Sequence, residues 1–300
     1  MRRFKLEEVE SIRDRVVIVT GCNSGVGFEI ANVLSQNKAR VIIACRDEAE
    51  GLGTQTRLGG DAEYINLDLS LPESIDRFVD SVKLKYQRVD VLINNAGVMI
   101  PPFTRTSQGL ELTFGVNYIG YFLLTNKLMP LMKRVKGSRV VNMSSISQYS
   151  VKNIDWANIN SQVEYRSYEA YALSNLFRMM FTIELENRLR TRKYETICVA
   201  CHPGVTITKI IRHIPRIFGI PLIATVLNNS IFQTPYKGAM SALMAATSSE
   251  VKGGDFIGLN TKRQIRGVPQ IVEPNQLVFD KNLREMLWNR SLEITGVDLE

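Results

Sequence analysis

The fold can be predicted from eight residues, Thr20-Gly21-Cys22-Asn23-Ser24-Gly25-Val26-Gly27. Residues 15–20 form a short β-branched run, which is typical of a buried strand. Residues 28–36 carry apolar side chains at helical spacing. A glycine-rich turn between a strand and a helix places the free N–H groups of the helix N-terminus where they can bind phosphate.

The three glycines of this turn each meet a separate steric need. Gly21 allows a sharp turn, Gly25 lets the backbone approach a pyrophosphate, and Gly27 lets the helix pack tightly on the strand. The pattern therefore predicts a dinucleotide site. The alternative is a glycine-rich loop that binds no ligand.

The same alternation of strand and helix continues along the chain. Strands are expected near residues 15–20, 40–45, 63–67, 89–93, 138–143, 195–200 and 255–259. Helices are expected at about 28–36, 73–86, 106–133, 168–190 and 235–247. This order predicts an α/β fold, a Rossmann-type doubly wound parallel sheet of about seven strands with helices on both faces.

The charge distribution indicates a solvated surface. The formal net charge is +7, and the basic residues occur in small groups that acidic residues separate. These groups are Arg2, Arg3 and Lys5; Lys133, Arg134, Lys136 and Arg139; and Arg188, Arg190, Arg192 and Lys193. We interpret them as solvated helix ends and loops. Since no nucleic-acid motif accompanies them, no nucleic-acid partner is expected.

The four cysteines are expected to be buried thiols in a reducing compartment. Cys198 and Cys201 form a CxxC pair followed by His202, but the segment reads as a strand. Strand residues three apart lie ~10 Å apart and face opposite sides, whereas a disulfide needs Cα atoms within ~7 Å. The N-terminus has no apolar run, so a secretory signal is not expected. A membrane face or a mitochondrial compartment stays open.

Two later motifs join the glycine turn. Asn94-Asn95-Ala96-Gly97 follows the fourth expected strand, and Pro203-Gly204-Val205-Thr206-Ile207-Thr208 follows the sixth. With the spacing TGxxxGxG of the turn, they resemble the short-chain dehydrogenase/reductase family over roughly residues 15–260. Residues 140–145 and 202–204 are most similar to its retinol dehydrogenase-like branch. That branch implies an apolar small-molecule carbonyl or alcohol as substrate.

The resemblance also assigns cofactor contacts. They fall on Gly21, Asn23, Ser24, Gly25, Val26, Gly27, Arg46, Asp68, Leu69, Asn95, Ala96, Gly97, Tyr171, Asn175, Pro203, Gly204, Val205 and Thr208. A position like Asp68 reaches the adenine amino group in the family, although Asp68 could instead form a turn before Ser70. A position like Thr208 helps to hold the nicotinamide amide.

The choice of nicotinamide depends on the end of the second strand. NAD-preferring sheets carry a carboxylate there for the ribose 2′-hydroxyl. This chain has Cys45 and then Arg46, whose guanidinium can pair with a 2′-phosphate. The sequence therefore predicts NADP(H) rather than NAD(H), although Asp47 could weaken the effect of Arg46.

Four catalytic positions follow from the resemblance: Asn117, Ser145, Tyr171 and position 175. The family has lysine at the fourth position, and this chain has Asn175. Tyrosine would exchange a proton with the substrate oxygen while serine steadies that oxygen. An ammonium nearby favours the phenolate that oxidation needs. Asn175 could hydrogen-bond a ribose but carries no charge.

Two interpretations remain open. The chain is either an NADP(H)-dependent oxidoreductase with weakened or altered activity, in which reduction survives better than oxidation, or an inactive NADP(H)-binding accessory or structural subunit of a larger assembly. Lys152 or Lys209 could replace the missing lysine, but the sequence places neither in the site.

The domain organisation is predicted from the same pattern. We expect an N-terminal arm at residues 1–14, a Rossmann-type NADP(H)-binding domain at 15–262 and a C-terminal extension at 263–300. The domain includes an apolar lid at 209–234, which could form a pocket wall that also contacts a membrane surface or a protein partner. The alternative is an ordinary buried lid. The resemblance implies a four-helix dimer seam from the helices near 106–133 and 168–190.

Overall fold

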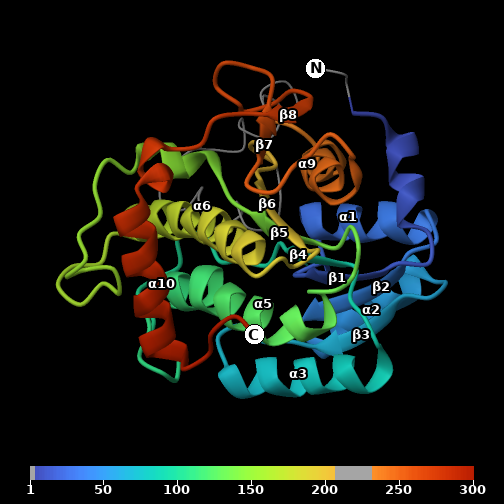
Figure 1. Cartoon of the computed structure of the whole chain (residues 1–300), viewed down its shortest axis with the longest axis horizontal. Helices are drawn as coiled ribbons and strands as arrows, with labels where there is room; N and C mark the ends of the chain where they lie inside the picture. The colour runs from blue at the N-terminus through green and yellow to red at the C-terminus, as the bar shows by residue number, and fades with distance from the viewer. Residues whose placement is uncertain (1–3, 207–231) are drawn as a thin grey trace, which may run out of the picture.

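The computed structural model describes residues 4–206 and 232–300 (Figure 1). The strands are β1 Val16–Thr20, β2 Arg40–Cys45, β3 Glu63–Asn66, β4 Val91–Asn94, β5 Arg139–Met143, β6 Ile197–Cys201, β7 Phe256–Leu259 and β8 Pro269–Ile271. The helices are α1 Gly25–Gln36, α2 Glu48–Leu58, α3 Pro72–Lys85, α4 Leu112–Phe114, α5 Gly120–Leu128, α6 Ser167–Thr191, α9 Pro235–Thr247 and α10 Lys281–Thr295. Short helical turns are η1 Leu6–Ile12, η2 Gly115–Ile119, η3 Met129–Leu131, η4 Ile146–Ser150 and η6 Gln276–Phe279.

All eight strands join one sheet in the order β3-β2-β1-β4-β5-β6-β7-β8. The first seven pair in parallel, and β8 pairs antiparallel with β7. The order runs outward in both directions from the β1–β4 pair, which is the Rossmann-type topology. The predicted doubly wound parallel sheet is therefore confirmed. The eighth strand comes from the C-terminal extension and has only three residues.

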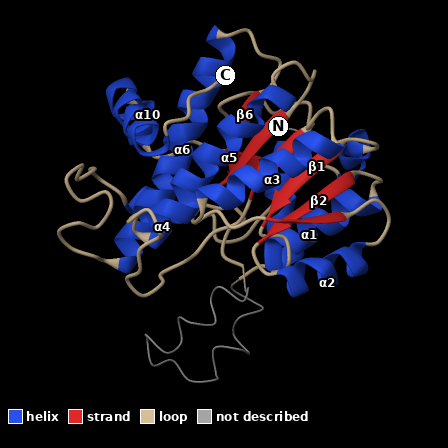
Figure 2. Cartoon of the chain, turned by 90° about the horizontal axis from the view of Figure 1, so that it is seen from below, coloured by secondary structure: helices blue, strands red, loops and turns tan. Residues whose placement is uncertain are grey.

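Helices cover both faces of this sheet (Figures 1 and 2). On one face, α1 and α9 pack together over β1, β4 and β5 and bury one apolar cluster. On the other face, α3, α5 and α6 bury a larger cluster that also takes in side chains of α10. Residues of a central strand point alternately into the two clusters, as Ile18 and Val19 of β1 do.

The helix predicted at 106–133 is wrong as a single element. The chain here makes an isolated bridge between Arg105 and Glu111, then α4, the π-helical turn η2, α5 and η3. The apolar periodicity runs through these pieces because one face of each is buried, so the pattern does not mark the breaks. Glu111 begins the first piece, and its carboxylate accepts from the N–H groups of Thr113 and Phe114 at 2.8 Å.

Two helices were not predicted. Helix α2 is polar and carries two glycines, and Gly51 lies where a Cβ would come within 2.3 Å of the Tyr64 ring. Helix α10 is mostly polar but buries Leu287 and Trp288. Each helix therefore depends on tertiary contacts more than on a strong apolar period.

The four cysteines are free and buried, as expected. Cys198 and Cys201 both lie on β6, which pairs in parallel with β5. Within the residues described, no helix is long and apolar enough to span a membrane.

The basic residues that were predicted to be solvated differ in their surroundings in the structure. Arg188 and Arg190 form ion pairs on α6 with Glu184 and Glu186, at 2.8 Å each. The expectation of a solvated side chain is wrong for Arg139, which donates to the carbonyls of Ala245 and Ser248 at the end of α9, both at 2.8 Å. Burial lowers the pKa of Arg139 to about 10.

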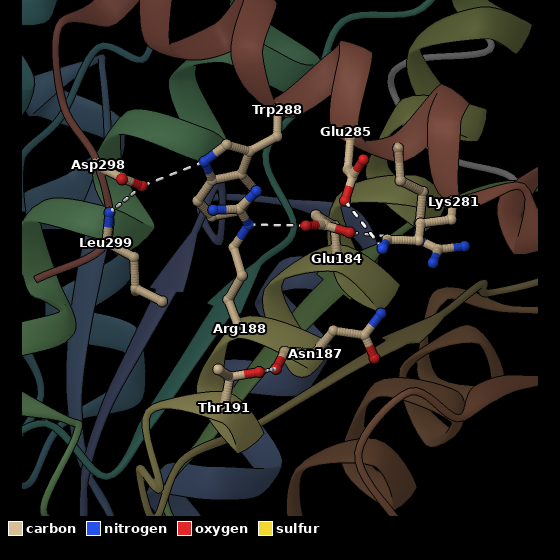
Figure 3. Close-up of polar contacts among 10 residues, drawn as sticks. Glu184, Asn187, Arg188, Thr191, Lys281, Glu285, Trp288, Asp298 and Leu299 are labelled. Atoms are coloured by element: carbon tan, nitrogen blue, oxygen red, sulfur yellow. Dashed lines mark hydrogen bonds and ion pairs between the residues drawn. The ribbon is translucent and has the colours of Figure 1, made fainter.

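Helix α10 lies against α6 and carries a buried indole, that of Trp288 (Figure 3). Arg188 of α6 stacks its guanidinium 4.1 Å from the centre of that ring. The ring centroid also lies 4.9 Å from that of Phe122 on α5 and 5.9 Å from that of Phe181 on α6. The indole Nε1 donates to Asp298 at 3.2 Å. The C-terminal extension thus covers apolar surface on the two helices that the resemblance assigns to a dimer seam.

Candidate active site

One cavity of about 660 Å³ opens at the carboxyl ends of β1 to β6. This is the edge at which ligands bind open α/β sheets, and the β1–β4 pair is its topological switch point. The cavity is large enough for a small organic ligand. The predicted site residues that line it are Gly21, Asn23, Ser24, Gly25, Val26, Gly27, Arg46, Asp68, Leu69, Asn95, Ala96, Gly97, Asn117, Ser145, Tyr171, Pro203, Gly204 and Val205.

The turn between β1 and α1 has no room for a side chain at Gly21 or Gly27. A Cβ on Gly21 would lie 2.7 Å from the Ala96 Cα, and one on Gly27 would lie 2.5 Å from the Gly21 oxygen. Gly21 and Gly25 have φ of +63° and +59°, in the left-handed region. The N-terminus of α1 at Gly25 therefore meets the cavity through bare backbone, as a phosphate-binding turn requires.

Asn95 and Thr20 brace this turn from behind. The Asn95 Nδ2 donates to the carbonyls of Thr20 and Gly21 at 2.9 and 3.1 Å. The Thr20 hydroxyl in turn accepts from the N–H groups of Asn95 and Ala96, both at 2.9 Å. The asparagine side chain therefore ties the loop after β4 to the turn after β1.

Arg46 lines the cavity at the end of β2 and is exposed. Asp47 beside it caps α2, because its Oδ1 accepts from the Glu50 N–H at 2.8 Å. A second cation lies near the turn: Arg57 of α2 donates to the Asn23 carbonyl at 3.1 Å and stacks over Phe28. Arg57 could not be found from the sequence, because α2 itself was not predicted.

Asp68 follows β3 and forms the turn that was its alternative role. Its Oδ1 accepts from the Ser70 N–H at 2.8 Å and from the Ser70 hydroxyl at 2.6 Å. Asp68 also lines the cavity, as does Leu69. The adenine contact stays a prediction.

Ser145 and Tyr171 reach the cavity from opposite segments. Ser145 follows β5 and begins η4, where its Oγ accepts from the Ser147 N–H at 3.2 Å. Tyr171 lies in the first turns of α6. Both side chains are partly accessible in the cavity wall. A hydroxyl and a phenol at one cavity can share a substrate oxygen, one donating a hydrogen bond and the other exchanging a proton.

Asn117 sits fully buried in the π-helical turn η2. Its Oδ1 accepts from the Val98 N–H at 2.8 Å, and its Nδ2 donates to the Val98 carbonyl at 2.9 Å. Its own carbonyl accepts from Arg178 Nε at 2.6 Å. A π turn at a cavity wall is a frequent feature of functional sites.

Asn175 is fully buried and lies behind the wall rather than in it. Its Nδ2 donates to the Tyr171 carbonyl at 2.8 Å and to the Ser147 hydroxyl at 3.3 Å. Its Oδ1 accepts from Arg178 Nη1 at 3.3 Å. These bonds occupy its amide, so a direct ribose contact stays a prediction.

The described part of the chain places neither Lys152 nor Lys209, the two lysines suggested as substitutes, at the cavity. Lys152 is exposed, and its Nζ donates to the Tyr149 carbonyl at 3.4 Å. Lys209 lies outside the described residues, as do Thr208 and nearly all of the predicted lid at 209–234.

The turn after β6 closes one side of the cavity with Pro203, Gly204 and Val205. His202 supports it from inside: its Nδ1 accepts from the Gly204 N–H at 3.0 Å, and its Nε2 pairs with Gln264 Oε1 at 2.7 Å. Burial lowers the pKa of His202 to about 4, with the Gln264 bond opposing that shift. The ring is therefore neutral at pH 7, with its proton on Nε2.

The most important residue that sequence reasoning missed is Arg178 of α6, which lines the cavity although it is only 4% exposed. Its signal was a lone arginine in the run Leu176-Phe177-Arg178-Met179-Met180-Phe181. Apolar residues also line the cavity, among them Val98, Met99, Leu112, Val116 and Ile146. These side chains come from segments whose positions only the fold defines.

The chain is similar to known enzymes over most of its length. Residues 15–216 match the family described as short chain dehydrogenase. The chain is 33% identical to polyprenol dehydrogenase of Danio rerio, with 99% of this chain and 91% of the relative covered. It is 36% identical to retinol dehydrogenase 11 of Homo sapiens, with 95% of this chain and 87% of the relative covered.

Solved structures have the same fold. An uncharacterised protein from Mycobacterium Paratuberculosis superposes with a TM-score of 0.82 at 30% identity, over 100% of both chains. The Pseudomonas aeruginosa RhlG/NADP active-site complex superposes with a TM-score of 0.68 at 24% identity, over 86% of this chain and 99% of the other.

Proposed function

This chain belongs to the short-chain dehydrogenase family, and from that premise we propose that it binds NADP(H) and transfers hydride between the nicotinamide and an apolar carbonyl or alcohol. The observation that carries the proposal is the single cavity that runs from the glycine turn and Arg46 to Ser145 and Tyr171. A nucleotide cradle and a proton-exchanging pair therefore face the same space.

The residues present fit the cofactor. The bare backbone at Gly21, Gly25 and Gly27 suits a pyrophosphate at the N-terminus of α1. Arg46 suits an additional phosphate on the adenine ribose, and Asp47 uses one carboxylate oxygen to cap α2. When bound there, NADP(H) supplies or accepts the hydride.

The protein's own part in the reaction is proton exchange and support of the substrate oxygen. Tyr171 donates its phenolic proton to that oxygen during reduction and takes it back during oxidation. Ser145 donates a hydrogen bond to the same oxygen. The phenol is already the form that reduction needs.

The substrate class follows from the wall of the cavity. Val98, Met99, Leu112 and Val116 contribute apolar side chains to this wall. Two of the relatives are named for polyprenol and retinol, which are apolar alcohols. We therefore propose a lipid-like carbonyl or alcohol as the substrate.

The test is turnover of NADPH against a panel of apolar aldehydes and ketones, with Tyr171→Phe as the variant. Loss of the proton donor should lower the rate by about 10³-fold. NADPH binding, followed by its fluorescence, should change much less than the rate, because the glycine turn and Arg46 are untouched. A protein that binds neither NADPH nor NADH at millimolar concentration would contradict the proposal.

A second candidate function is an NADP(H)-binding accessory or structural subunit that catalyses no reaction. The observation that favours it is Asn175, which is neutral and hydrogen-bonded behind the wall. Tight NADPH binding with no turnover over the whole panel, in the wild type and in Asn175→Lys alike, would support this candidate over the first.

A further inference from the structure

Arg178 is a buried cation whose hydrogen bonds go to neutral groups. Its Nε donates to the Asn117 carbonyl at 2.6 Å, and its Nη1 donates to the Met143 carbonyl at 2.7 Å and to Asn175 Oδ1 at 3.3 Å. Its Nη2 donates to the Ala96 carbonyl at 3.2 Å. Within the described part of the chain, no carboxylate forms an ion pair with it. These bonds use four of its five N–H groups and leave its charge uncompensated.

An uncompensated charge is costly to bury, so its position needs a reason. The other well-buried arginine of this helical layer, Arg284, pairs with the Glu184 carboxylate at 3.4 Å. Arg178 instead lines the cavity that Ser145 and Tyr171 line. Its positive charge therefore acts on the space where we propose that the substrate oxygen and the nicotinamide ribose lie.

Arg178 lies on the same face of α6 as Tyr171, and its side chain extends toward the end of the helix where Tyr171 lies. Residues 171, 175 and 178 share one face of α6, because they are spaced by four and three positions. Long side chains on a helix extend toward its N-terminus. The bond from Arg178 Nη1 to Asn175 Oδ1 agrees with that direction. The guanidinium thus reaches from position 178 to the level of position 175.

The loop after β4 leaves space for this guanidinium. A Cβ on Gly97 would lie 3.0 Å from Arg178 Nη2 and 3.0 Å from Asn117 Oδ1. The Arg178 guanidinium also lies 4.5 Å from the centre of the Tyr121 ring. Glycine at 97 and a ring at 121 thus hold the planar group in one orientation.

We propose that Arg178 supplies the fixed positive charge of this active site, in place of the lysine that the family has at position 175. This inference rests on the proposed function. The charge favours the phenolate of Tyr171 when oxidation requires a base, and it stabilises negative charge on the substrate oxygen. Asn175 then serves as a neutral spacer that accepts from the guanidinium, and a lysine there would be repelled by it.

The competing explanation is that Arg178 only ties three segments together through the carbonyls of Ala96, Asn117 and Met143. The two roles predict different results when the Arg178 charge is removed. If Arg178 only holds the three segments together, its removal should lower stability and leave the pH dependence of the reaction unaltered. A charge that acts on the phenol should shift the pH dependence of oxidation.

The experiment compares alcohol oxidation and carbonyl reduction over pH for the wild type, Arg178→Met and Arg178→Lys. With Arg178→Met, we expect oxidation at pH 7 to fall about 100-fold and reduction to fall less than about 10-fold. The pH profile of oxidation should move to higher pH, because a nearby opposite charge changes the pKa of an ionisable group by about 1–3. Arg178→Lys keeps a cation and should retain the profile. It also serves if Arg178→Met does not fold.

Rescue makes the test specific. Asn175→Lys alone places a second cation beside Arg178 and should gain little. In the Arg178→Met background, the same change should recover oxidation to within about 10-fold of the wild type. That coupling is the signature of one charge supplied from either position. Arg284→Met, a buried arginine away from the cavity, is the matched control and should lower stability without moving the pH profile.

Unchanged oxidation and an unchanged pH profile in Arg178→Met would overturn the inference while leaving the proposed function intact. A wild type that turns over no substrate would instead count against the proposed function. Even then, an ultraviolet titration of the wild type against Tyr171→Phe, repeated in the Arg178→Met background, tests the inference: the Tyr171 phenolate should form at lower pH when Arg178 is present.

Discussion

The two ends of the cavity are held by different kinds of interaction. At the nucleotide end, Gly21 and Gly27 leave bare backbone, and the fit depends on the absence of side-chain volume. At the catalytic end, Asn117, Asn175 and Arg178 are buried polar side chains that join α6, η2 and the strand ends. The first end should therefore be sensitive to added atoms, and the second to changes of charge and protonation.

Acid should destabilise the turn after β6 through His202, which supports that turn by its bonds to Gly204 and Gln264. Its pKa is about 4 in the folded protein, against 6.5 for an unperturbed ring. The unfolded state therefore binds more protons between these values, and stability present above pH 6.5 is lost as the pH falls toward 4. The loss is about 3 kcal/mol from this residue. Urea unfolding at pH 7 and pH 4 measures it.

The control for this prediction is His202→Gln, which cannot titrate. The carboxylates contribute equally in both proteins, so the pH dependence of the difference in unfolding free energy isolates His202. Parallel stability curves for the two proteins between pH 7 and 4 would show that the buried ring is not the acid-sensitive group.

An added methyl group at the nucleotide end should weaken NADPH binding and leave catalysis at the other end of the cavity nearly unchanged. In Gly27→Ala, the Cβ would lie 2.4 Å from Asn95 Nδ2, so the turn must shift at a cost of about 2 kcal/mol. We expect NADPH binding to weaken about 30-fold while kcat at saturating NADPH stays within about 3-fold. Gly53→Ala is the matched control, because nothing lies within 4 Å of that Cβ. A large fall in kcat for Gly27→Ala would mean that the two ends are coupled.

Removing the Arg46 charge at the nucleotide end should weaken the binding of NADPH more than the binding of NADH. Arg46→Ala should weaken NADPH binding about 10-fold, because one charge-assisted contact to the additional phosphate is lost. NADH binding should change less than about 2-fold, since NADH lacks that phosphate. Binding titrations with both nucleotides measure the ratio, and equal losses for the two would exclude the predicted pairing.

The smallest effect is expected from the neighbouring carboxylate. Asp47→Asn keeps a good helix cap for α2 but removes a negative charge next to Arg46. NADPH binding should tighten about 2-fold, and the unfolding free energy should change little. Weaker binding in this variant would mean that the Asp47 charge orients Arg46 rather than opposing it.

Sequence reasoning succeeded where local sterics define the structure. The turn at Gly21, Gly25 and Gly27 has the expected backbone, because left-handed φ and close approach admit little but glycine. The strands and their parallel order follow from apolar runs and intervening helices. Nearly all predicted site residues within the described chain line one cavity, because the carboxyl ends of parallel strands meet at one edge.

It failed where side chains act over long sequence distances. Arg178 sits in an apolar helical run, and only the folded chain reveals that its partners come from residues 96, 117 and 143. The bonds of Asn175 to Tyr171, Ser147 and Arg178 could not be predicted either, because these groups meet only in the folded chain. Helix α2, with its glycines, is stabilised by contacts with β3 that no local pattern predicts.

The position of α10 has a consequence for how the chain is made. The aromatic residues that Trp288 touches on α5 and α6 precede it in the chain, so these helices leave the ribosome well before their cover does. During that interval Phe122 and Phe181 lack the cover of Trp288, and apolar surface exposed in this way is prone to aggregation. Synthesis that stalls before residue 281 would therefore release an aggregation-prone intermediate. This intermediate would already contain all the residues of the glycine turn.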